Sequence, residues 1–125
     1  MARRTNVILG AGVIACIATV LVWLYLERGV LVTVRNSDAR ALRSVSVHVT
    51  GRAYVLGDLE PGATRSVRVN PTGESSVEIR FRDDSGKTKS LDAGGYIEAG
   101  YAGSMEVDVD FERVRKAECS AHPWP

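Results

Sequence analysis

The sequence predicts an all-β fold, a small antiparallel sandwich of about seven strands, preceded by one transmembrane α-helix. Twenty consecutive uncharged residues run from Val7 to Leu26, and after Gly29 apolar and polar residues alternate with a period of two. Turn-forming residues separate the alternating stretches at short intervals. The chain has 125 residues, which leaves room for one domain beyond the membrane segment.

The N-terminal run is long enough to cross a membrane. Eleven of its residues are Val, Ile or Leu, and about twenty apolar residues in a helix span a hydrocarbon core of about 30 Å. Trp23 and Tyr25 lie near its C-terminal end, where aromatic side chains favour the membrane interface. We therefore expect a short cytoplasmic segment over residues 1–6 and a signal-anchor helix over residues 7–28.

Two alternatives to a retained anchor stay open. A cleaved signal peptide has small residues after its apolar core, whereas residues 23–26 are bulky. A lipoprotein signal would place the lipidated cysteine at Cys16, after Val13-Ile14-Ala15, but the apolar run continues well past this position.

The charges that flank the run predict its orientation. Arg3 and Arg4 precede it, whereas Glu27 and Arg28 follow it and nearly cancel. Because cytoplasmic flanks carry the excess of Lys and Arg, the N-terminus is expected in the cytoplasm. The single-pass chain would then hold its C-terminal domain outside the cytoplasm, in the periplasm or at the cell surface.

Small residues recur on one face of the predicted helix. Ala11, Ala15 and Thr19 are four residues apart, and Gly12 and Cys16 lie beside them. Small side chains let two membrane helices approach closely, so these five residues are candidates for self-association and the chain for a homodimer. Small residues are also common in membrane helices that have no partner.

Valines alternate with polar residues in five segments of the outer region. The segments are residues 30–35, 45–50, 67–70, 77–82 and 106–112. Such alternation indicates strands with one buried face and favours antiparallel sheets. The residues expected to line the inner faces are the valines with Ile79, Phe81 and Phe111, and those expected to cover one end are Leu56 and Leu59.

Residues typical of turns lie between the expected strands. Thr50-Gly51 favours a tight hairpin, and Glu60-Pro61-Gly62 places proline and glycine as a type II turn requires. Asp83-Asp84-Ser85-Gly86 fits a hairpin with glycine in the left-handed position. Gly94-Gly95 and residues 100–103 are expected to form further breaks between strands.

The number and spacing of these strands over residues 29–113 match an immunoglobulin-like sandwich. The stretches VTVRN at 32–36, VSVHV at 45–49, GDLEPG at 57–62 and SVRV at 66–69 resemble the immunoglobulin-like and fibronectin-like adhesion modules of bacterial surface proteins. That resemblance implies a non-catalytic binding or spacer module and transfers no functional residue.

Charge and motifs exclude several classes of function. The formal net charge is +1, so the basic footprint that binds nucleic acid is missing. No serine lies in the context of a nucleophile elbow. We therefore expect no enzyme activity, no cofactor and no nucleic-acid partner.

Four carboxylates are expected on one face of the last predicted strand: Glu106, Asp108, Asp110 and Glu112. Alternate residues of a strand are about 7 Å apart, which is too far for their side chains alone to share one cation. We expect them to form a solvated face that meets Arg80 and Arg82 of a neighbouring strand.

The C-terminal residues 114–125 are expected to form a flexible tail. Cys119 and His122 are too few ligands for a structural zinc site, so Cys119 is interpreted as a free thiol or as half of an intermolecular disulfide. Trp124 lies between two prolines and is a candidate for docking into a partner.

These observations predict a membrane-anchored domain that binds or scaffolds a protein. Its partners would be the lipid bilayer and a protein, which it would contact through a strand edge or through Arg80, Arg82 and Trp124. The alternative is an accessory subunit of an envelope complex that acts through its transmembrane helix.

Overall fold

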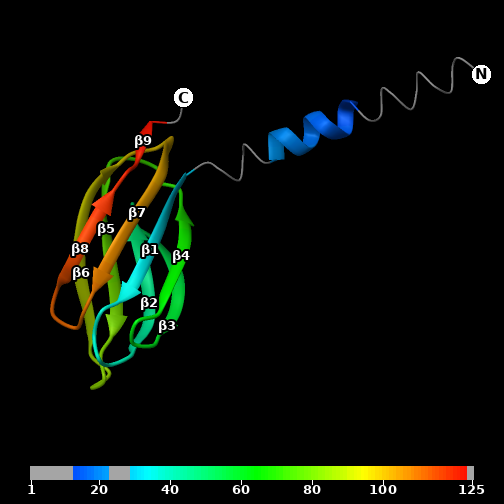
Figure 1. Ribbon diagram of the computed structural model, residues 1–125. Coiled ribbons are helices and arrows are strands. Elements are labelled where there is room, and N and C mark those ends of the chain that lie inside the picture. Colours follow the sequence, from blue (N-terminus) through cyan, green and yellow to red (C-terminus); the bar gives the residue numbers. More distant parts are fainter. Residues whose placement is uncertain (1–12, 23–28, 124–125) are drawn as a thin grey trace, which may run out of the picture.

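The computed structural model describes residues 13–22 and 29–123 (Figure 1). Within this part of the chain, nine strands form two sheets packed face to face, which confirms the all-β prediction. Sheet A has the order β4-β1-β7-β8, with β9 also beside β7, and sheet B has the order β3-β2-β5-β6. The strands are β1 (Gly29–Asn36), β2 (Leu42–Val49), β3 (Arg52–Leu59), β4 (Thr64–Val69), β5 (Ser75–Arg82), β6 (Thr88–Ile97), β7 (Tyr101–Val109), β8 (Val114–Cys119) and β9 (His122–Pro123).

The core lies between the sheets and consists mainly of the alternating valines. The valines of β1 and β2 are at most 1% exposed, whereas Arg35 at the end of β1 is exposed. Ile79 and Phe81 of β5 are buried from the opposite sheet, as the sequence predicts, and so are Phe111 and Leu59. Burying a side chain of this size stabilises the fold by roughly 1.5–3 kcal/mol, so the two valine-rich inner faces hold the sandwich together.

β1 is an interior strand of sheet A and lies between two neighbours of opposite direction. It pairs antiparallel with β4 and parallel with β7, and the parallel pair departs from the fully antiparallel arrangement that the sequence predicts. Gly29 and His122 both lie opposite Ala102, so the domain begins and ends at the same end of the sandwich, here called the terminal end. The carboxyl ends of β1 and β7 meet at the other end, the loop end (Figure 1).

A buried amide joins the two sheets at the loop end. The side-chain Nδ2 of Asn36 donates hydrogen bonds of 2.9 Å to the carbonyl oxygens of Leu59 in β3 and of Arg40. Its Oδ1 accepts from the backbone N–H of Asp38 at 2.8 Å. Asn36 is 0% exposed, and a buried polar group without partners costs about 1–3 kcal/mol, so this network fixes how β1 meets β3.

Asp38 joins the chain segments that follow β1 and β7, and Asp110 stabilises the turn after β7. The Oδ2 of Asp38 accepts a hydrogen bond of 3.0 Å from the backbone N–H of Phe111, and its Oδ1 accepts one from Nε of Arg40 at 3.0 Å. The Arg40 guanidinium lies 4.0 Å from the centre of the Phe111 ring. Asp110 caps its own turn by accepting from the backbone N–H groups of Glu112 and Arg113.

The predicted hairpins form as expected at two sites. Thr50 and Gly51 have φ values of 48° and 77°, which is typical of a type I′ turn and joins β2 to β3. Gly86 has φ of 81° in the turn that joins β5 to β6. The prediction of a break at Gly94-Gly95 is wrong, because both glycines lie inside β6, where the pairing with β5 shifts register and β6 bulges.

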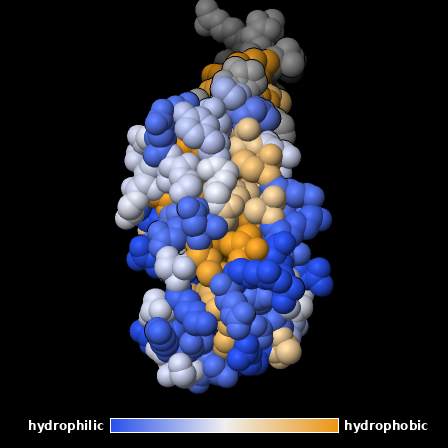
Figure 2. Space-filling view, turned by 90° about the vertical axis from the view of Figure 1, so that its left-hand side faces the viewer, coloured by the Kyte–Doolittle hydropathy of each residue, from blue (hydrophilic) through white to orange (hydrophobic). Residues whose placement is uncertain are grey.

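The prediction of a flexible tail from residue 114 is also wrong, because residues 114–119 form β8 and residues 122–123 form β9. Ala117 lies opposite Val107 and Cys119 opposite Met105, so these residues of β8 face the core side of sheet A. Ala121 packs against the core as well. Viewed from the side of β6 and β8, apolar surface runs between the two strand edges (Figure 2).

Residues 13–22 form an α-helix whose side chains are all exposed. Within residues 13–22 and 29–123, no helix is both long and apolar enough to span a membrane. The remaining parts of the predicted span, residues 7–12 and 23–28, lie outside the described residues, as do the predicted cytoplasmic segment and Trp124.

The contacts of Asp38 predict a loss of stability in acid. The side-chain hydrogen bond from Arg40 lowers the pKa of Asp38 from 3.8 to about 2, and its side chain is 10% exposed. Because the folded-state pKa lies below the unfolded one, this stabilisation is present above about pH 4 and is lost between about pH 4 and about pH 2. We expect Asp38→Asn to lower the free energy of unfolding at neutral pH by roughly 1–2 kcal/mol.

Urea denaturation of the full chain in detergent, followed by circular dichroism across this pH range, measures the effect. Asp84→Asn is the matched control, because Asp84 is 64% exposed and its ion pair with Arg40 is 3.9 Å long. If the stability of Asp38→Asn falls with acid as steeply as that of the parent chain, the assignment to Asp38 is contradicted.

Candidate functional site

The outer face of sheet A brings side chains from four strands into rows. Thr33 of β1 lies opposite Ser66 of β4 and Glu106 of β7, and Glu106 lies opposite Glu118 of β8. The next row toward the loop end contains Thr64, Arg35, Asp108 and Lys116, in the order β4, β1, β7 and β8. Acidic and basic groups from strands distant in sequence therefore lie side by side on one flat surface.

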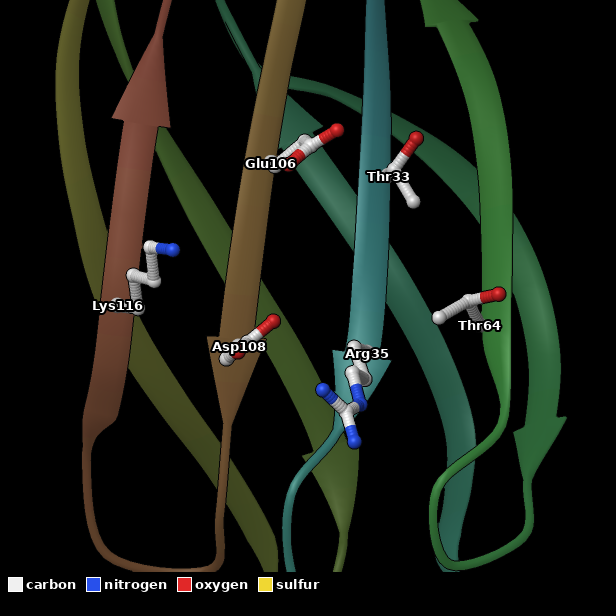
Figure 3. Close-up of a pocket in the computed structure, with 6 residues that line it drawn as sticks. All are labelled: Thr33, Arg35, Thr64, Glu106, Asp108 and Lys116. Atoms are coloured by element: carbon white, nitrogen blue, oxygen red, sulfur yellow. The ribbon is translucent and has the colours of Figure 1, made fainter.

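A shallow hollow of about 250 Å³ lies on this face, and six side chains line it (Figure 3). They are Thr33, Arg35, Thr64, Glu106, Asp108 and Lys116. In Figure 3 the carboxylate of Glu106 points toward Thr33, and that of Asp108 points toward Arg35. The hollow is open and polar, which is a shape suited to contact with a surface rather than to enclosing a small molecule.

Three charges in this hollow are free to bind a partner. Among the described residues, Arg35, Glu106 and Asp108 have no side-chain hydrogen bond and no ion pair within 4.0 Å. Lys116 makes an ion pair of 3.3 Å with Glu118 on its own strand. Because an exposed ion pair of this kind contributes at most about 1 kcal/mol, Lys116 can exchange Glu118 for another acid at little cost.

The acidic residues are arranged differently from the sequence prediction. Glu106 and Asp108 are on the outer face of β7, but Asp110 is 6% exposed and lies past the end of the strand. Burial raises the pKa of Asp110, and hydrogen bonds from the Glu112 N–H, the Arg115 side chain and the Arg113 N–H outweigh that effect, so the pKa is lowered. Asp110 is therefore a structural cap.

The predicted pairing of these acids with Arg80 and Arg82 is wrong, because β5 and β7 belong to different sheets. Arg80 and Arg82 are exposed on the outer side of sheet B. The basic residues beside Asp108 are Arg35 and Lys116 instead. The alternation of apolar and polar residues in the sequence places these side chains on a solvent-exposed face. Which of them lie beside one another depends on the order of the strands in the sheets.

On the outer face of sheet B, Glu78 and Arg80 are paired with each other. Nε of Arg80 donates to Oε1 of Glu78 at 2.8 Å, and the Ser90 hydroxyl also donates to Glu78. Nε2 of His48 lies 2.9 Å from the Ser46 hydroxyl. His48, Glu78 and Arg80 border an open hollow of about 380 Å³, but Glu78 and Arg80 already form an ion pair with each other.

His48 does not have the surroundings of a catalytic base. Desolvation lowers the pKa of His48, and the positive charge of Arg80 lowers it further against the opposing effect of Glu78. Ser46 lies two residues away on the same extended strand, which is not the strained turn of a serine nucleophile. Within the described residues, no group of three or more His, Cys, Asp or Glu side chains could hold a metal ion.

The other predicted candidates are separate from the sheet A face. Ala15, Cys16 and Thr19 lie in the helix over residues 13–22, where the Thr19 hydroxyl donates to the Ala15 carbonyl at 2.9 Å. Ala11 and Gly12 lie outside the described residues. Cys119 is an exposed thiol on β8.

Comparison of the chain with protein-family models, curated proteins and solved structures yields no match. Function must therefore be inferred from the geometry and charges of the two sheet faces and the strand edges.

Proposed function

We propose that the chain is a membrane-tethered, non-catalytic module that binds a protein partner through the outer face of sheet A. The observation that supports this most strongly is the set of unpaired charges in the hollow, formed by Arg35, Glu106 and Asp108. On sheet B the charges that line the hollow, Glu78 and Arg80, neutralise each other. Charges that lack internal partners are available for electrostatic complementarity with another protein.

A membrane tether is the second part of the proposal. It is supported by the uncharged run over residues 7–26 and by the exposure of apolar side chains in the helix, such as Ile14 at 70% and Leu21 at 60%. Exposed apolar surface on this scale marks a site of contact with a membrane or another protein, and a bilayer would remove these side chains from water. The domain begins at its terminal end, so a tether there would leave both sheet faces and the loop end accessible.

The fold is proposed to belong to the immunoglobulin-like class in its layers but not in its strand order. Two sheets packed over an alternating core are typical of that class. However, β2 and β3 form a hairpin within one sheet, whereas the second and third strands of an immunoglobulin domain lie in different sheets. The resemblance to bacterial adhesion modules therefore supports the binding proposal only through shared architecture.

A second candidate function is an accessory subunit of an envelope complex that acts through its helix. The exposed helix over residues 13–22, with Ala15, Cys16 and Thr19 among its residues, favours this alternative. In that case, Ala15→Leu would abolish association, and changes on the sheet faces would have no effect.

Thiol labelling tests the placement of the domain. With Cys16→Ser in the background, we expect a membrane-impermeant maleimide to label Cys119 in intact cells, because this thiol is exposed and the domain is proposed to lie outside the cytoplasm. Cys119→Ser is the control for specificity. Labelling that requires lysis of the cells would contradict the proposed orientation.

Site-specific photocrosslinking in native membranes tests the binding face. A photoreactive amino acid at Thr64, beside the sheet A hollow, is expected to give a discrete adduct, whereas the same group at Ser76, beside the sheet B hollow, is not. We expect Arg35→Glu to reduce the Thr64 adduct by about tenfold, since like charges at an interface cost up to several kcal/mol. Arg82→Glu on sheet B is the matched control.

The outcomes separate the two functions. Loss of the adduct with Arg35→Glu but not with Arg82→Glu supports the sheet A face. Loss with Ala15→Leu alone supports the helix. If the photoreactive group gives the same adduct yield at Thr64 and at Ser76, and Arg35→Glu does not change that yield, the sheet A proposal is contradicted.

A further inference from the structure

β8 is an edge strand of sheet A. Along the side of β8 that faces away from β7, no other described strand is paired with it. Among the described residues, β8 pairs only with β7. The backbone N–H of Ser120 donates to the Ser104 carbonyl at 2.7 Å. Because backbone groups alternate in direction along an antiparallel strand, those of Ala117 and Cys119 point away from β7. Two successive backbone positions are thus available to a further strand.

The side chains of β8 alternate between the core side and the outer face of sheet A, and this alternation limits which strand can pair with β8. Ala117 and Cys119 face the core side, opposite Val107 and Met105. Lys116 and Glu118 face outward, with side chains 63% and 61% exposed. A small residue that faces inward therefore lies between a base and an acid that face outward.

This pattern is complementary to itself. A second copy related by a two-fold axis through Ala117, perpendicular to the sheet, would run antiparallel to β8 with Ala117 opposite its own copy. Lys116 would then lie opposite Glu118 of the second copy, and Glu118 opposite Lys116, which gives two favourable cross-strand pairs. The outward-pointing N–H of Ala117 would donate to the C=O of Ala117 in the second copy, and its C=O would accept from that copy's N–H.

Neighbouring registers lack this complementarity. An axis through Lys116 or Glu118 would place like charges directly opposite each other, which destabilises a strand pair. An axis through Cys119 would place Glu118 opposite Ser120 and lose both charge pairs.

We propose that β8 joins two copies of this chain edge to edge, with Ala117 on the two-fold axis. Sheet A then continues from one copy into the other, and the two binding faces form one surface. The second copy would also lie beside the apolar strip that is visible between the edges of β6 and β8 (Figure 2). An open edge that would otherwise favour uncontrolled association is thereby closed.

Disulfide trapping of the purified full-length chain in detergent tests the register. All variants carry Cys16→Ser, so that each chain has one thiol. In Ala117→Cys/Cys119→Ser, the paired Cα atoms would lie about 5.5 Å apart, within the range for a disulfide. We expect this variant to form a covalent dimer under mild oxidation, whereas Cys119 alone does not, because its copy would lie about 13 Å away along the strands.

A charge exchange tests the same contact without a new thiol. We expect Lys116→Glu and Glu118→Lys each to weaken dimerisation by roughly tenfold, since each creates two like-charge pairs. The double variant Lys116→Glu/Glu118→Lys restores the pairs and should restore the dimer. Sedimentation in density-matched detergent measures the dimer fraction, and circular dichroism checks that these exposed substitutions leave the fold intact.

The proposal is overturned if the chain with Cys119 crosslinks and the Ala117→Cys/Cys119→Ser variant does not, if neither chain crosslinks, or if the double charge variant fails to recover. A dimer held by the helix over residues 13–22 would be unaffected by all three charge variants. That result would also overturn the proposal that β8 joins the two copies. The purified chain contains no other protein, so these outcomes are independent of whether the sheet A face binds a partner in native membranes.

Discussion

The parallel pairing of β1 with β7 constrains the rest of the domain. Parallel strands cannot be joined by a hairpin, so the chain between them forms the β2–β3 and β5–β6 hairpins of sheet B and returns once to sheet A as β4. As a result, β1 lies in the interior of sheet A with a ladder on each side. The same pairing brings the ends of β1 and β7 together, where Asn36 and Asp38 connect the two sheets and the two strands.

The candidate binding face follows from this arrangement. Arg35 and Asp108 are far apart in sequence and become neighbours only because β1 lies beside β7 in parallel register. On sheet B, the partners Glu78 and Arg80 belong to one strand and neutralise each other locally. The two outer faces are both polar, but on sheet A a base and two acids within one hollow, Arg35, Glu106 and Asp108, are left without side-chain partners among the described residues, and the open edge of β8 borders that face.

Local pattern is sufficient to predict some features of the fold and insufficient for others. The two-residue alternation of Val30, Val32 and Val34 identifies their buried side, and Thr50-Gly51 identifies its hairpin, because both depend on neighbouring residues. The sequence does not predict β8, because Ala117 and Cys119 are too small to make the alternation visible between charged residues. The partners predicted for Arg80 and Arg82 are wrong because strand order is a long-range property that a single sequence does not encode locally.

The most direct test of this account is amide hydrogen exchange of the domain by NMR, with β1 compared with the edge strands β3 and β4. A strand paired on both sides opens only with global unfolding, whereas edge amides directed outward exchange without it. With β1 paired on both sides, we expect the amides of residues 30–35 to be all among the slowest to exchange, with no alternation along the strand. Fast exchange at every second amide of β1 would show that one of its two neighbours is missing, which contradicts the parallel pair.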